Sequence, residues 1–232
     1  MDNVLFHYFT NRYQQKEKDT NKLRDTTDAG PVVTVSREFG CHGKEFSRDL
    51  KQRLETQGKP WQIVSKEVLD HAAKELKLHP RQLEYVFKGE RRSDIEEMLT
   101  AMSSRFYKGE YGIRKALRKV IYKLAYQGNA IILGRCGVCI AQDIEKSLHI
   151  KLEAPVEHRI ANIMQWKSIN ADEAARLMNE MDKNREFVLH NFSKKVFDPH
   201  MFDLKINMGR FNVAEAVDLT VKVLEMKNIV RY

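Results

Sequence analysis

The stretch Pro31 to Ser47, PVVTVSREFGCHGKEFS, decides the fold of this 232-residue chain. Val32 to Val35 is a short β-branched run, and it predicts a buried strand. Gly40 and Gly43 then interrupt the apolar pattern, and an amphipathic segment with helical spacing follows. A strand, a tight glycine turn and a helix are the parts of a phosphate-binding loop. The glycines let backbone N–H groups approach an anion, and the helix N-terminus adds partial positive charge.

Lys44 directly follows Gly43, where a P-loop places the lysine that reaches the outer phosphates. The match to G-x-x-x-x-G-K-[ST] is partial, because Glu38 stands at the first glycine position and Glu45 at the hydroxyl position. The nearest downstream hydroxyl belongs to Ser47. On these residues alone, the turn is either a phosphate site or only a connection between a strand and a helix.

Four further short stretches with strand-like patterns alternate with helical patterns, at residues 61–64, 130–133, 147–152 and 203–208, and the one at 130–133 is wholly apolar. Together with the first run they predict an α/β fold with about five strands in a mostly parallel sheet and helices on both faces. The clearest helical pattern covers residues 113–125, with an apolar stripe on one side and basic residues on the others. A capping-box pattern at Asn212 to Glu215 predicts the start of the last helix, which should run to about Asn228.

The composition narrows the class of protein. No apolar run approaches the ~20 residues of a membrane span, and the first residues lack a signal-peptide pattern, so we expect a cytoplasmic protein without a membrane partner. The net charge of +8 suits phosphorylated substrates or nucleic acid. Because the basic residues are dispersed, a nucleic-acid partner is disfavoured. Cys136 and Cys139 follow a predicted strand, as a redox pair would, but buried or semi-exposed thiols are the simpler interpretation, as for Cys41.

The stretch VTVSREFGCHGKEFSRDL resembles the opening of the cytidylate kinase-like family, a divergent branch of the P-loop nucleoside monophosphate kinases. Further matching stretches follow in the family's order: ILGRCG at 132–137, HIKLEAPVEHRI at 149–160, Asp182 with Arg185, and FDLKINMGRFNVAEAVD at 202–218. The resemblance implies a P-loop kinase-type three-layer fold over residues 31–232. It places an N-terminal extension at 1–30, a helical acceptor-binding insertion at about 65–110 and a lid at about 157–197.

The same resemblance implies roles for particular residues. The acceptor phosphate would lie at Gly134 and Arg135, which follow a buried strand at the sheet edge where ligands bind in α/β folds. In the lid, Asp182 would orient arginines, while Arg159 and Arg185 would stabilise the transferring phosphoryl group together with Lys44. Mg²⁺ would bridge the phosphates, with Glu45 and Ser47 as its few protein candidates. The ATP phosphates would be held by Gly40, Cys41, His42, Gly43, Lys44 and Glu45.

The implied activity is transfer of the ATP γ-phosphoryl group to a nucleoside monophosphate, with CMP or dCMP first, by a monomer or homodimer. One alternative is a nucleotide-binding regulatory protein that has lost catalysis, because the loop departs from the motif and Ser65 stands where the family commonly has an aspartate. Another is an anion- or nucleic-acid-binding regulator, which rests on net charge and the basic helix. The base and sugar of the acceptor stay open, as does an acceptor that is not a nucleotide.

Overall fold

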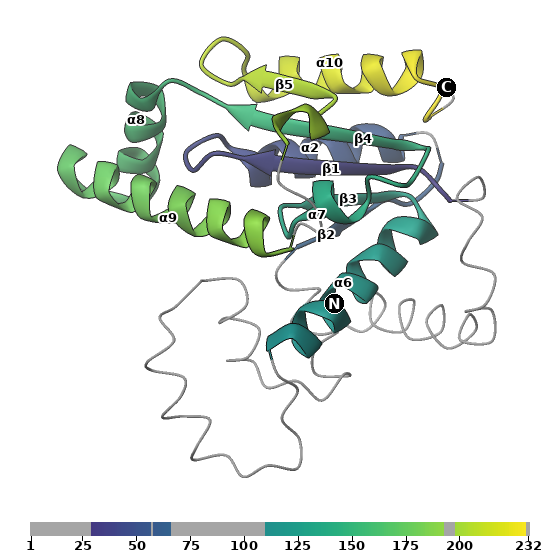
Figure 1. Cartoon of the computed structure of the whole chain (residues 1–232). Helices are drawn as coiled ribbons and strands as arrows, with labels where there is room; N and C mark the ends of the chain where they lie inside the picture. Colours follow the sequence, from purple (N-terminus) through teal and green to yellow (C-terminus); the bar gives the residue numbers. More distant parts are fainter. Residues whose placement is uncertain (1–28, 57, 66–109, 193–197, 231–232) are drawn as a thin grey trace, which may run out of the picture.

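The computed structural model of the protein describes residues 29–56, 58–65, 110–192 and 198–230. At its centre lies a five-stranded sheet with the order β2-β3-β1-β4-β5, in which every strand pair is parallel (Figure 1). The strands are β1 (Val32–Arg37), β2 (Gln62–Val64), β3 (Ala130–Leu133), β4 (Ser147–Glu153) and β5 (Leu204–Asn207). The predicted α/β fold with its parallel sheet is confirmed.

Strand β1 is the central strand, between β3 and β4, and its first four residues are buried. It pairs with β3 through Val32–Val35 and with β4 over its whole length. Ser36 and Arg37 pair with Lys151 and Leu152 of β4, so the strand continues two residues beyond the β-branched run that predicted it. This extension carries Arg37 to the carboxyl edge of the sheet.

Helices cover both faces of the sheet, which gives the expected three layers (Figure 1). On one face, α2 (Gly43–Glu55) and α10 (Val213–Met226) share an apolar cluster with Val33 and Val35 of β1. On the other face, α6 (Glu110–Gln127) and the short α7 (Gly137–Ile140) pack with Val32. The alternation of side chains along β1 therefore feeds two separate cores. The capping box of Asn212 and Glu215 is confirmed at the start of α10.

Helices α8 (Val156–Lys167) and α9 (Ala171–Phe192) form a pair beyond the carboxyl ends of the strands (Figure 1). They pack on each other through a small cluster of Ile163, Ala174 and Met178. The predicted lid falls on this pair, within residues 157–192 of the described chain. A 3-10 turn, η3 (Pro199–Met201), precedes β5.

Several predictions lie outside the described residues. These are the extension before residue 29 and almost all of the acceptor-binding insertion expected at about 65–110. In the described part of the chain, no helix is both long and apolar enough to cross a membrane.

Candidate functional site

The loop between β1 and α2 places the predicted phosphate-binding residues at the carboxyl edge of the central strand. Gly40 has a φ of +100°, and a Cβ there would lie 2.8–2.9 Å from atoms of Arg159 on α8, so only glycine allows the loop this approach to the helix. Asn162 of α8 donates a hydrogen bond of 2.8 Å to the carbonyl oxygen of Gly40. The loop is thus held from both sides, by β1 and by α8.

The start of α2 is open to an anion. The N-cap residue, His42, has a left-handed φ of 47° and its side chain makes no capping hydrogen bond. The N–H groups of the first helical turn have no intrahelical acceptor, and His42 leaves Gly43 and Lys44 uncapped. The Lys44 side chain is exposed. This end of the helix therefore has the donors and the partial positive charge that a phosphate needs.

The other side chains of the predicted loop differ in position. The thiol of Cys41 is buried in the core, while Glu45 is exposed and its Oε2 lies 2.5 Å from Nδ1 of His42. Ser47 is fully buried, and its hydroxyl donates to the carbonyl oxygen of Gly43 at 2.8 Å. Of the two Mg²⁺ candidates, Glu45 is therefore accessible and Ser47 is not.

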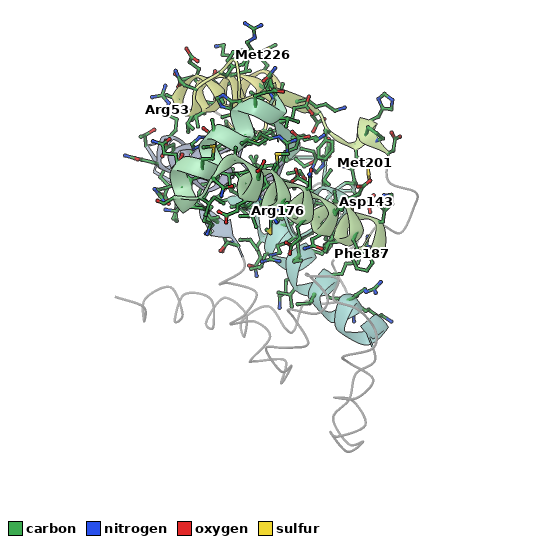
Figure 2. The ribbon with its side chains drawn as sticks, turned by 90° about the vertical axis from the view of Figure 1, so that its left-hand side faces the viewer. Arg53, Asp143, Arg176, Phe187, Met201 and Met226 are labelled. Carbon is green, nitrogen blue, oxygen red and sulfur yellow. The ribbon has the colours of Figure 1, made fainter. Side chains whose placement is uncertain are left out.

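Asp182 on α9 joins the lid to the loop. Its Oδ1 accepts a 2.8 Å hydrogen bond from the backbone N–H of Phe39, and its Oδ2 lies 2.5 Å from Nη1 of Arg159. Nη1 of Arg185 is 3.4 Å from Oδ1 and also donates to the carbonyl oxygen of Arg37 at 3.1 Å. The structure thus brings Asp182 together with both arginines that it was predicted to orient. Figure 2 views the molecule from the side of these two helices, with Arg176 and Phe187 labelled on α9.

Arg159 lies beneath the loop. Only 8% of the residue is exposed, and its Nε is 3.6 Å from a carboxylate oxygen of Glu38. Glu38 also accepts a hydrogen bond of 3.2 Å from the N–H of Ala154. Arg159 is therefore held between two carboxylates, whereas Arg185 has the weaker contact and keeps more exposure, with 24% of its side chain accessible.

Gly134 and Arg135 form a tight left-handed turn after β3. The φ values of Gly134, Arg135 and Cys136 are 70°, 53° and 55°. Two of these are not glycine, and a left-handed residue of that kind costs about 1 kcal/mol or more. Strain of this kind is concentrated at functional sites. The left-handed residues turn the chain at Arg135 away from the direction of β3. This turn lies at the edge of the sheet where ligands bind in α/β folds.

Arg37 lies between the loop and this turn, and the sequence analysis gave it no role. A Cβ on Gly43 would lie 3.0 Å from its Cγ, and a Cβ on Gly134 would lie 2.2 Å from its Nη1. Burial, followed by the charges of Arg185 and Arg135, lowers the pKa of Arg37 to about 9. The charges of Arg185 and Arg135 act on Arg37, and Asp182 joins Arg185 to Arg159. These four arginines form the arginine cluster of the site.

Arg159 and Arg185 lie close to the cluster's carboxylates. Arg159 contacts Glu38 and Asp182, and Arg185 contacts Asp182. Burial also lowers the pKa of Arg185, with Asp182 as the main opposing influence. Several guanidinium groups at a sheet edge, beside an uncapped helix N-terminus, are an environment for phosphate.

The three cysteines are free and buried. Burial raises the pKa of Cys41 to about 12 and that of Cys136 well above its ordinary value. The thiol of Cys136 lies 3.3 Å from the carbonyl oxygen of Val188 as a donor. Such thiols are poor nucleophiles, which agrees with the interpretation of these residues as buried thiols. Within the described residues, no group of three or more His, Cys, Asp or Glu side chains could hold a metal ion.

Sequence reasoning missed four residues of the site: Arg37, Glu38, Phe39 and Asn162. A signal for Arg37 was present, because a charged residue directly after a buried central strand lies at the ligand-binding edge. Asn162 carries no comparable signal in its helix.

A parallel α/β sheet with a glycine turn after its central strand and an arginine-bearing helical pair beyond the strand ends has the architecture of a P-loop kinase-type nucleotide kinase. The comparison with protein families agrees at the level of sequence. The profile of the cytidylate kinase-like family matches residues 32–210. The chain belongs to this family.

Some known proteins resemble the chain at low sequence identity. An uncharacterized protein from Eubacterium ventriosum superimposes with a TM-score of 0.63 at 21% identity, over 84% of this chain and 98% of that one, which shows a shared fold. A shikimate kinase from Acinetobacter baumannii gives a TM-score of 0.48 at 10% identity, over 89% and 100% of the two chains. A uronate isomerase from Corynebacterium glutamicum is 28% identical over 106 residues, and this match spans 44% of the chain and 20% of the length of that curated relative.

Proposed function

We propose that the protein transfers the γ-phosphoryl group of ATP to a nucleoside monophosphate, with CMP or dCMP as the first acceptors to test. The observation that carries this proposal is the arginine cluster beside the uncapped start of α2. Phosphoryl transfer requires little more than the alignment of two phosphates and the neutralisation of their charge. Membership of a kinase-like family supports the same reaction. We expect it to take place in the cytoplasm.

In this proposal the two phosphates are held at the turns that follow two neighbouring strands, β1 and β3. The first turn of α2, with Gly43 and Lys44, holds the ATP phosphates, as the backbone of Gly40 to Glu45 was predicted to do. Arg135, with the turn at Gly134, holds the phosphate of the acceptor. Mg²⁺, when bound to the phosphates, would lower their charge, and Glu45 is the accessible carboxylate at this end of the helix. Magnesium commonly keeps few protein ligands in kinases.

Arg185 and Arg159 take different parts. Arg185 contacts Asp182 at 3.4 Å and is the more exposed of the two, so it can turn toward a transferring phosphoryl group. Arg159 is enclosed by Asp182 and Glu38 and contributes its charge from beneath the loop. Asp182 keeps both in position. Closure of α8 and α9 over the loop would exclude water from the reaction.

The second candidate is a nucleotide-binding protein without catalysis. It is favoured by Ser47, the hydroxyl nearest the motif position, which is buried and engaged with the carbonyl oxygen of Gly43. Such a protein would bind ATP without turnover. The two functions differ in products and in their need for an acceptor.

A coupled assay of ADP release, with ATP, Mg²⁺ and each of CMP, dCMP, UMP, AMP and GMP, tests the proposal. We expect turnover that depends on the acceptor and falls by at least about 100-fold in Lys44→Ala and in Arg135→Ala. Arg48→Ala is the matched control, because Arg48 is an exposed residue of the same helix as Lys44. ATP binding without turnover for any of the five acceptors would reject the nucleoside monophosphate kinase and favour the second candidate.

A further inference from the structure

Arg37 is a charged side chain without a counterion at the centre of the site. Among the described residues, no carboxylate lies within the 4.0 Å of an ion pair with its guanidinium group, and its contact with Arg185 is made by its backbone carbonyl oxygen. Asp182 acts on it only at longer range. A partly buried guanidinium with five N–H donors normally finds an acceptor. The N–H donors of Arg37 are therefore available to an anionic ligand.

Two glycines from distant parts of the chain make room for this side chain. Gly43 opens α2 and faces the stem of Arg37, since a Cβ there would lie 3.0 Å from Cγ. Gly134 follows β3 and faces the guanidinium, where a Cβ would lie 2.2 Å from Nη1. Arg37 therefore spans the gap between the helix start that suits a donor phosphate and the turn that carries Arg135.

The surroundings of Arg37 disfavour the charged form of its guanidinium group. Burial and the neighbouring Arg185 and Arg135 lower its pKa to about 9, from an ordinary 12.5, and Asp182 only partly offsets them. Charged Arg37 therefore destabilises the ligand-free fold at neutral pH, because a lowered pKa of a base means that folding disfavours the proton.

We propose that Arg37 is a phosphate-binding residue, and that it holds the oxygens of the phosphoryl group at the junction between the donor and acceptor sides of the site. The identity of that group rests on the proposed function, but the binding of an anion rests on the geometry of Arg37 alone. The ligand class is a polyphosphate or a pair of adjoining phosphates, because one guanidinium can contact oxygens on both sides.

The test compares the wild-type protein with Arg37→Gln, Arg37→Lys and Arg48→Gln. Arg48→Gln removes the same charge from an exposed position on α2. Calorimetric titration with inorganic tripolyphosphate at constant ionic strength gives the affinity, and thermal unfolding without ligand gives the structural effect. We expect Arg37→Gln to weaken binding by about 10- to 100-fold, as for loss of a charge-assisted hydrogen bond. Arg37→Lys should lose less, and Arg48→Gln less than about threefold.

The ligand-free melting temperature separates binding from structure. We expect Arg37→Gln to melt at the wild-type temperature or above it, since the substitution removes an uncompensated charge. A melting temperature several degrees lower in both Arg37 variants would assign the residue to structure and overturn the proposal. So would tripolyphosphate affinities equal in Arg37→Gln and Arg48→Gln, or no binding by the wild type. Binding that depends on Arg37 in a protein without kinase turnover would leave this inference standing while the proposed function fails.

Discussion

Asp182 is the residue whose removal should disturb the site most, because it holds groups from three segments. In Asp182→Asn, the amide oxygen can still accept the hydrogen bond from the N–H of Phe39, now 2.8 Å long. The amide nitrogen then faces Nη1 of Arg159, so two donors oppose each other where a 2.5 Å ion pair stood. Arg159 keeps only Glu38, at 3.6 Å.

The size of the effect follows from these contacts. A charge-assisted hydrogen bond contributes about 1.5–3 kcal/mol, and breaking a buried pair costs about 3–5 kcal/mol. The side chain of Asp182 is 30% exposed, so screening reduces the larger figure. The 3.4 Å contact with Arg185 adds a few tenths of a kcal/mol. We expect Asp182→Asn to lower the free energy of unfolding by about 2–3 kcal/mol.

Urea unfolding, followed by circular dichroism, measures this loss. Glu180→Gln is the control, since Glu180 is an exposed acid on the same helix. Saturating tripolyphosphate should restore part of the stability of Asp182→Asn, because the anion supplies the charge that the arginines have lost. A free energy of unfolding for Asp182→Asn within about 0.5 kcal/mol of the wild type would refute the reasoning. So would an equal gain in stability from tripolyphosphate in Asp182→Asn and Glu180→Gln.

Three further results should follow. Burial lowers the pKa of His149 to about 4 from an ordinary 6.5, so the stability from its neutral ring is complete above pH 6.5 and lost as the pH falls through 4, by at most about 3 kcal/mol. Urea titrations across this range should show the loss in the wild type, and an equal loss in His149→Gln would contradict it. Gly134→Ala adds a methyl group 2.2 Å from Nη1 of Arg37, at a φ of 70°, so the affinity for tripolyphosphate should fall about tenfold. Unchanged affinity would show that the Arg37 side chain can move aside without losing the anion, against this prediction. A thiol reagent such as DTNB should label none of the three buried cysteines in the folded protein and all three in urea, and rapid labelling without urea would disprove their burial.

The sheet could be predicted from the sequence because each strand contains a short stretch rich in apolar residues between turn or helical segments, and β3 (AIIL) is wholly apolar. The run at 130–133 matches β3, and the run at 147–152 ends one residue before β4 does. The end of β1 could not be predicted from the sequence in the same way. Ser36 and Arg37 are polar, and they are in the strand only because β4 offers them pairing partners more than 100 residues away. Tertiary pairing of this kind overrides local preference.

The sequence predicted several residues of the site but not the contacts between its distant segments. Asp182 and Arg185 share a helical face at a spacing of three residues, which a sequence shows directly. That Asp182 also accepts from the N–H of Phe39 depends on how α9 meets the loop, 143 residues away in sequence. The proposed role of Arg37 likewise depends on its contact with Gly134, which no local pattern connects with it.

The departure of the loop from the P-loop motif has a structural reason in Glu38. This residue stands at the first glycine position, yet its N–H donates to the carbonyl oxygen of Leu152 and its carboxylate accepts from the N–H of Ala154. The same carboxylate lies 3.6 Å from Nε of Arg159. A glycine there would leave Arg159 buried with one counterion in place of two. The motif position is therefore used to anchor an arginine. In the proposed function, side-chain guanidinium groups would take over part of the anion binding that backbone N–H groups provide in the full motif. The missing glycine is, by itself, no evidence of a lost site.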